Sequence, residues 1–418
     1  MLRLCDMVGN SLRRGYGALR SGPRTNQSGK SMGISETDWS SYQFGNKIAP
    51  MGRSMRSSPT GGEPQVHRCQ PAKSPVLRGT AVPRLPYRTI DMHCHLAAPT
   101  VERLVAGLPG KVAETAASRE EMGQVSFDIN MAQAALLLPQ LTTVESRLID
   151  MDAMGVDVQV ISPSPAQIYY WAEHELAENI VGLQNDAIAA VCQMFPDRFR
   201  GLGAIALQHP EQAAGQLRRI VRERGFKGVE VSSYVSGKDI ADRFFDPFWA
   251  AADELGAVVF IHPWGTSLGT RLSKHYLMNS IGQPLEHTIC LSKLIFSGVL
   301  DRHPAVKILA AHGGGYLPAY VQRSDHAHAL RPEARGCQCR PSDYLRRMWF
   351  DSVVYEADNL RRLIEVVGRD RVVVGTDYPF DMGHYDPSSL IRPLDEETQR
   401  MILGVNAETL LGMQEKDL

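Results

Sequence analysis

Short apolar runs rich in Val and Ile alternate with longer segments in which apolar residues recur every three or four positions. The short runs predict buried strands, and the longer segments predict amphipathic helices. Eight strands are expected: Thr89–Leu96, Val156–Ser162, Phe199–Leu207, Phe226–Ser232, Ala257–His262, Val306–His312, Met348–Val354 and Arg371–Asp377. Helices are expected at Val144–Met154, Ala177–Gln193, Pro210–Arg224, Asp246–Leu255, Leu285–Leu300, Asp358–Val367 and Glu396–Leu411.

Strands that alternate with helices predict right-handed crossovers and a parallel sheet, and eight such units favour closure into a (β/α)8 barrel of the TIM type. A doubly wound open sheet is the alternative. It is disfavoured because no G-x-G-x-x-G motif follows an early strand. We therefore expect one α/β domain over residues 87–418.

Residues 1–86 are rich in Ser, Gly, Arg and Pro and have no sustained apolar period, which predicts a disordered tail. The Arg-rich opening, residues 1–24, is similar to an organellar transit peptide. We favour a simpler interpretation, in which the segment is a dispensable tail or an extension upstream of a true start at Met32, Met51 or Met55.

Charge is distributed unevenly along the chain. The formal net charge is -1, yet residues 1–88 hold 14 Lys+Arg against 4 Asp+Glu, which leaves 31 and 42 for residues 89–418. An acidic body without a basic stripe argues against nucleic-acid binding. No run of about 18 apolar residues predicts a membrane span. Seven scattered cysteines indicate a reducing, cytoplasmic protein rather than a small disulfide-stapled one.

The expected strands end in polar residues of the kinds that bind metals. In a strand, side chains alternate between faces, so His93 and His95 project to the same side and Cys94 points away. His262 ends the fifth strand, His312 the sixth and Asp377 the eighth. Because the C-terminal ends of barrel strands meet at one rim, these side chains should converge.

Imidazoles and a carboxylate that converge on one rim predict a metal site, because a metal offsets the cost of burying such polar groups. We expect one divalent ion held by His93, His95 and His262, with Asp377 as a further ligand or a proton carrier. His312 is expected to act as a general base beside a water that the metal activates. Zn²⁺ suits these donors best, and Mn²⁺, Fe²⁺ or Co²⁺ would also suit them. Lys227 and Glu230, in the fourth strand, are interpreted as structural.

Four motifs then point to a family: I-D-M-H-C-H, V-F-I-H-P-W-G, A-A-H-G-G-G-Y-L-P and V-V-V-G-T-D-Y-P-F. Together they resemble the amidohydrolase superfamily, whose fold is a metal-dependent hydrolase barrel. More narrowly, they resemble its decarboxylase branch of 2-amino-3-carboxymuconate-6-semialdehyde, γ-resorcylate and 5-carboxyvanillate decarboxylases. The resemblance implies a single divalent metal, usually zinc, held by His93, His95, His262 and Asp377, with His312 as the base that activates water.

The resemblance also implies substrate contacts. Arg323, eleven residues after His312, matches an arginine that reaches into the neighbouring subunit of a dimer and binds a substrate carboxylate. Trp264 is expected to wall the pocket, although core packing would explain it equally. The second carboxylate-binding arginine of the family has no match, because residues 120–146 contain no Lys or Arg. Residues 130–141 are instead largely apolar, which favours an aromatic or dienoic substrate with a single carboxylate.

The expected function is therefore metal-dependent, non-oxidative decarboxylation of a small carboxylated aromatic or muconate-semialdehyde-type substrate. A metal-dependent hydrolase of an amide, ester or lactone is the main alternative, because an activated water beside a histidine can also attack a carbonyl. A barrel without catalytic activity that serves as a binding protein is a second alternative, and metal analysis separates it from both enzymes.

Overall fold

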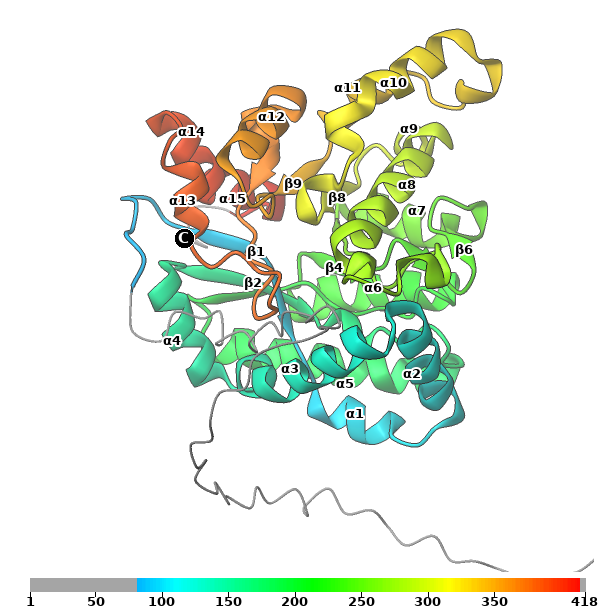
Figure 1. The fold of residues 1–418 in the computed structure, drawn as a ribbon, viewed down its shortest axis with the longest axis vertical. Helices are drawn as coiled ribbons and strands as arrows, with labels where there is room; N and C mark the ends of the chain where they lie inside the picture. The colour runs from blue at the N-terminus through cyan, green and yellow to red at the C-terminus, as the bar shows by residue number, and fades with distance from the viewer. Residues whose placement is uncertain (1–80, 414–418) are drawn as a thin grey trace, which may run out of the picture. The chain divides into compact units, whose positions relative to one another are not determined.

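The computed structural model describes residues 81–413, which belong to one compact unit (Figure 1). The predicted disorder of the tail falls, up to residue 80, outside the described residues. Nothing in residues 81–413 forms a helix both long enough and apolar enough to cross a bilayer.

All eight expected strands are present and parallel, in two sheets with the orders β1-β2-β3 and β10-β9-β8-β7-β4. Their bounds are β1 Ile90–Leu96, β2 Val158–Pro163, β3 Phe199–Gly201, β4 Gly228–Val231, β7 Val258–Ile261, β8 Lys307–Ala310, β9 Trp349–Asp351 and β10 Val372–Val373. Parallel bridges link Gly203 to Val229 and Asp91 to Val374, so pairing continues from β3 to β4 and from β10 back to β1. The prediction of an eight-stranded β/α barrel is confirmed. A short antiparallel pair, β5 Tyr234–Val235 and β6 Lys238–Asp239, follows β4.

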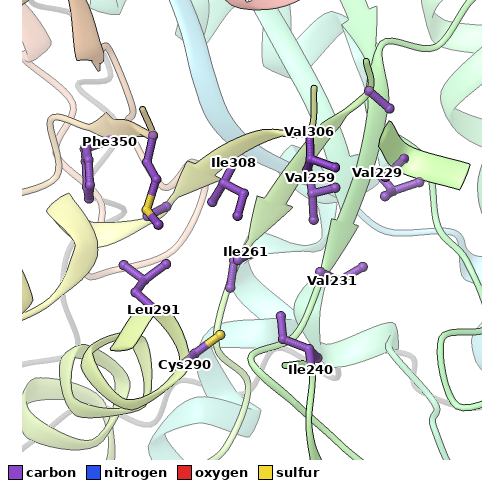
Figure 2. Close-up of a cluster of buried hydrophobic side chains, with 14 of the residues drawn as sticks. Val229, Val231, Ile240, Val259, Ile261, Cys290, Leu291, Val306, Ile308 and Phe350 are labelled. Carbon is purple, nitrogen blue, oxygen red and sulfur yellow. The ribbon is translucent and has the colours of Figure 1, made fainter. Parts of the chain in front are cut away.

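Two apolar clusters cover the two faces of these strands. One is formed by inward-facing residues such as Met92, Val160 and Phe260. The larger cluster lies between the strands and the helices, where Cys290 and Leu291 of α8 pack beside Ile261 (Figure 2). The pleat explains this division, because alternate residues of a strand face opposite sides.

The helices are α1 Pro99–Val105, α2 Pro109–Met122, α3 Gln124–Thr142, α4 Val144–Met154, α5 His174–Met194, α6 Pro210–Arg224, α7 Asp246–Leu255, α8 Gln283–Phe296, α9 Val299–Arg302, α10 Leu317–Leu330, α11 Pro341–Leu345, α12 Ala357–Val367, α13 Pro387–Ile391, α14 Glu396–Arg400 and α15 Asn406–Leu411. The expected helix 285–300 is divided in two because Gly298 adopts φ 69. A π-helical segment, Met401–Val405, interrupts the helix expected over 396–411.

The first connection of the barrel is an insertion of three helices, α1 to α3, which precedes the crossover helix α4 (Figure 1). No helix had been predicted before residue 144. Helix α3 carries apolar residues all round and leaves Val125, Leu136 and Leu138 exposed, with Leu136 at 65%. The apolar stretch therefore forms a helix that is only partly covered in this chain.

A β-bulge interrupts β1 just before the histidines. Asp91 pairs with Gln159 and Cys94 with Ile161, so the register shifts by one residue between them. Met92 and His93 consequently both face the barrel interior, whereas Cys94 packs in the outer cluster. The expected common orientation of His93 and His95 is observed, together with the outward direction of Cys94.

Candidate metal centre

The five side chains predicted at the rim come together at the C-terminal end of the barrel. His93 and His95 lie in β1, His262 directly follows β7, and His312 and Asp377 lie in the loops after β8 and β10. One ligand atom from each of His93, His262, His312 and Asp377 lies within 4.8 Å of the others. The four can therefore face a single ion.

Asp377 lies at the centre of this group. Its Oδ1 is 3.3 Å from Nε2 of His93 and 3.4 Å from Nε2 of His95, and its Oδ2 is 3.6 Å from Nε2 of His312. The ring centroid of His262 lies 4.9 Å from that of His95. These spacings place the fifth side chain, His95, beside the other four.

The polar atoms that face this centre lack protein hydrogen-bond partners. Among the described residues, none hydrogen-bonds to Nε2 of His93 or His95, to either ring nitrogen of His262, or to Oδ1 of Asp377. His93 and His95 are completely buried and His262 and Asp377 nearly so. Buried polar atoms of this kind are costly unless a ligand satisfies them, and a divalent cation fits a set of imidazole nitrogens and a carboxylate oxygen.

The electrostatics of the centre also favour a cation. Burial lowers the pKa of His93, but the charge of Asp377 and a hydrogen bond to Asp351 outweigh it and raise that pKa to about 10. Burial raises the pKa of Asp377, but the charge of His93 and the close approach of the surrounding histidine nitrogens hold it well below its usual value. Burial and repulsion by the neighbouring histidines lower the pKa of His262 well below its usual value. Buried carboxylates thus hold positive charge at this rim.

Asp351, the last residue of β9, supports the centre from behind and was not among the predicted site residues. Its Oδ2 lies 2.5 Å from Nδ1 of His93 and accepts from the backbone N–H of His312 at 3.0 Å. Its Oδ1 accepts from the N–H of Gly313 at 2.9 Å. The carboxylate therefore fixes the orientation of the His93 ring and the position of the loop that carries His312. No signal in the sequence marks Asp351, because the expected strand Met348–Val354 places it in the middle, whereas β9 ends at this residue.

Glu230, interpreted from the sequence as structural, also lies at the centre. It is 3% exposed, and its Oε2 lies 3.4 Å from Nδ1 of His95. Burial lowers the pKa of His95, whereas Glu230 and Asp377 outweigh it and raise that pKa. Lys227 directly precedes β4, at the end of the strand opposite to the C-terminal rim.

Two site residues adopt backbone conformations that are rare outside glycine. His312 has φ 51 and Asp377 has φ 57. Gly313, Gly314 and Gly315 continue the left-handed course after His312, with φ between 59 and 74. Left-handed conformations of non-glycine residues cluster at functional sites, where the surrounding structure holds them in place.

Trp264 and Arg323, the predicted substrate contacts, lie in the loop after β7 and on α10. Trp264 is 39% exposed in the loop after His262, and its backbone N–H donates to Oγ of Ser232. Arg323 lies exposed on α10. Neither lines the cavity beside His312, which has a volume of about 530 Å³ and is bordered by residues that include Gln283 and Tyr355.

The arginine that is missing from residues 120–146 is not replaced by its neighbour Arg147. That side chain is 1% exposed, donates to the carbonyl oxygens of His95 and Gln140, and lies over the ring of Tyr378. Its hydrogen bonds hold the end of β1. Residues 124–142 form α3, where Gln133 donates to Asp381 in the loop after Asp377.

Three known proteins illustrate what this chain is similar to. It is 35% identical over 272 residues to the 2-amino-3-carboxymuconate-6-semialdehyde decarboxylase of Dictyostelium discoideum, covering 64% of this chain and 76% of the relative. It is 29% identical over 301 residues to the γ-resorcylate decarboxylase of Rhodococcus jostii, and the match covers 65% of this chain and 90% of the relative.

The third is a solved structure, the 5-carboxyvanillate decarboxylase of Novosphingobium aromaticivorans in complex with manganese and 4-hydroxy-3-methoxy-5-nitrobenzoic acid. It matches with a TM-score of 0.69 and 25% identity, covering 80% of this chain and 98% of that one. A model of the amidohydrolase family matches residues 90–413, which include β1, β10 and every predicted site residue. The chain belongs to the amidohydrolase family.

Proposed function

We propose that this protein is a metal-dependent, non-oxidative decarboxylase of a small carboxylated aromatic or muconate-semialdehyde-type substrate. The observation that carries the proposal is the set of buried donor atoms without hydrogen-bond partners around Asp377. The relatives reported above are decarboxylases, which favours this reaction over hydrolysis of an amide, ester or lactone.

His93, His95, His262 and Asp377 would hold one divalent ion, for which we propose Zn²⁺, with Mn²⁺, Fe²⁺ or Co²⁺ able to occupy the same donors. Manganese is the ion in the related 5-carboxyvanillate decarboxylase structure. When bound, such an ion polarises substrate oxygens and lowers the pKa of a water at the open position.

The protein groups beside the ion would move the proton. Decarboxylation breaks the bond between the carboxylate carbon and the ring, and the ring carbon gains a proton as carbon dioxide leaves. Nε2 of His312 lies 3.6 Å from Oδ2 of Asp377, so a closer approach of the two side chains would let a proton pass between them. We assign His312 as the base that takes a proton from water and Asp377 as the carrier that delivers it to the ring carbon. The hydroxide that remains would regain a proton from solvent after carbon dioxide has left.

Substrate binding would involve the cavity beside His312 and a second copy of the chain. We propose that Trp264 walls the substrate site and that Arg323 binds the carboxylate of a substrate in the partner subunit of a homodimer. Arg323 is exposed and forms no ion pair with the described residues, so it is available for such a contact, and the guanidinium fork fits a carboxylate. We also propose a cytoplasmic location, in keeping with free thiols at Cys94, Cys192, Cys290, Cys337 and Cys339.

Metal quantitation followed by a carbon dioxide release assay tests the function. The protein should retain about one divalent ion per chain and release carbon dioxide from at least one of a panel of hydroxybenzoates, dihydroxybenzoates and muconates. A parallel assay should detect no acid release from lactones. A protein that binds no Zn, Mn, Fe or Co after reconstitution would contradict both enzyme functions, and lactone hydrolysis without carbon dioxide release would favour the alternative.

A further inference from the structure

His287, on α8, is a fully buried histidine that the proposed mechanism does not use. Its side chain has 0% exposure, and neither ring nitrogen has a hydrogen-bond partner among the described residues. An unpaired polar group in a protein interior is destabilising, because it has lost its hydrogen bonds to water without gaining others. Such a residue needs an explanation, because leucine or phenylalanine would fill the same volume without this cost.

The ring of His287 lies against the ring of His312. Their centroids are 5.6 Å apart with an interplanar angle of 74°, an edge-to-face arrangement. Two further rings, those of His93 and His262, contact His312 within the described residues, and both belong to the candidate ligands. His287 is therefore the contacting ring whose nitrogens are not committed to a metal.

His312 also has a ring nitrogen without a hydrogen-bond partner among the described residues. Its Nε2 faces Asp377, whereas its Nδ1 is buried and has no partner. A histidine that accepts a proton at Nε2 must carry its hydrogen at Nδ1, and a hydrogen-bond acceptor at Nδ1 fixes that tautomer. Asp351 binds the backbone of His312 but not its Nδ1.

Helix α8 holds His287 firmly in this position. Cys290 and Leu291, on the next turn, pack against the strands (Figure 2). The backbone N–H of Tyr316 donates a hydrogen bond to the hydroxyl oxygen of Thr288 at 2.9 Å. This bond connects the helix to the loop after His312. Burial, together with the charges of His312 and His93, lowers the pKa of His287 well below its usual value, so the ring is neutral and has a free lone pair.

We propose that His287 is a positioning residue, which accepts the hydrogen bond from Nδ1 of His312 and thereby keeps Nε2 of His312 free to take a proton. This role rests on the proposed function of His312 as the base. Nitrogens of the two rings would meet after a small rotation of one ring, since the rings are already in contact.

Two substitutions separate this role from simple packing. His287→Phe preserves the aromatic contact and removes both nitrogens, whereas His287→Gln removes the ring and offers an amide oxygen as acceptor. If the hydrogen bond matters, kcat should fall at least about tenfold in His287→Phe and stay within about threefold in His287→Gln, with KM and metal content unchanged in both. Cys290→Ala, on the same helix, is the matched control for lost packing and should retain kcat.

The reverse order, with His287→Phe active and His287→Gln impaired, would show a packing role and overturn the proposal. Equal losses in the two variants would also overturn it. If His287→Phe does not fold, His287→Leu takes its place in the same comparison.

A second readout does not depend on turnover. In the zinc-loaded protein labelled with ¹⁵N-histidine, the signals that vanish in His312→Ala report the His312 ring. They should show a protonated Nδ1 in the wild type and in His287→Gln, and a protonated Nε2 in His287→Phe. An unchanged tautomer in His287→Phe would overturn the proposal, and this result stands whether or not the wild type releases carbon dioxide.

Discussion

At the scale of single residues, the two roles assigned at the centre differ in a measurable way. His93→Ala and His95→Ala each remove a proposed ligand and should lose most bound metal together with activity. His312→Ala should abolish carbon dioxide release and retain about one ion per chain, because the proposed ligands are intact. Metal analysis of the purified variants distinguishes the roles, and loss of metal in His312→Ala would make His312 a ligand, as the grouping of donor atoms also allows.

Asp351 gives a second prediction at this scale. In Asp351→Asn the amide can accept only through one atom, so it cannot serve His93 and the backbone of His312 and Gly313 together. Residues that orient metal ligands typically change metal affinity by about 10–100-fold when replaced, and we expect a loss of that size in competition titrations with a chelator. Asp152→Asn, which affects only a surface pair with Arg198, should leave metal affinity unchanged.

At the scale of elements, the loop after β8 depends on glycine. A Cβ on Gly315, at φ 67, would lie 2.0 Å from the carbonyl oxygen of Pro284. Gly315→Ala should therefore reduce the free energy of unfolding by about 2–4 kcal/mol and lower activity by displacing His312. Urea denaturation measures the first effect.

Gly182 in the middle of α5 is the matched control, because a Cβ there meets nothing within 4 Å. Gly182→Ala should stabilise the protein by about 0.5–1 kcal/mol. Equal effects of the two substitutions would mean that the loop has no special dependence on Gly315.

The strands and helices also show which parts of the fold could be predicted from the sequence. All eight strands were predictable, because buried parallel strands are continuous apolar runs and their ends carried the histidines and Asp377. Helices α1 to α3 were missed, because residues 99–142 lack a clear amphipathic period and α3 is apolar all round. The bulge in β1 has no signal in the sequence, since it arises from pairing with β2.

The site residues likewise divide into those that could be predicted from the sequence and those that could not. Ligand types at strand ends could be predicted from spacing and from the barrel rule. Asp351 and His287 could not be predicted, because each matters through a contact with a residue far away in the chain. Asp351 contacts His93, 258 positions away, and His287 contacts His312, 25 positions away. Glu230 was interpreted as structural because the sequence does not show that its carboxylate lies beside His95.

At the scale of the whole molecule, a bound ion should stabilise the barrel. An ion at about 100 times its dissociation constant adds about 2.7 kcal/mol to the free energy of unfolding. For a chain of this size we expect Tm to rise by roughly 3–4 °C when zinc or manganese is added to chelated protein. Calorimetry with and without metal measures the shift, and no shift in Tm would argue against an intact site in the folded protein.

The proposed dimer predicts complementation between inactive variants. If Arg323 acts in the partner's site, Arg323→Ala and His312→Ala should each be nearly inactive alone. Mixed and allowed to exchange, half of the dimers would be mixed and each would have one complete site, so activity should recover to about a quarter of the wild type. No recovery despite exchange, measured with tagged subunits, would place Arg323 in its own subunit's site or outside any site.

The pairing of β1 with the segment after β10 has a consequence for how the protein is made. Met92 donates to the carbonyl oxygen of Val374, and the N–H of Asp377 donates to the carbonyl oxygen of His93. The first and last strands of the barrel thus bring together donors that are 284 positions apart in the chain. On the ribosome, a nascent chain cannot assemble the complete donor set until nearly all of the barrel has been synthesised. Capture of the proposed ion would then be a late event in biosynthesis, and we expect a truncated chain that lacks the last strand not to retain it.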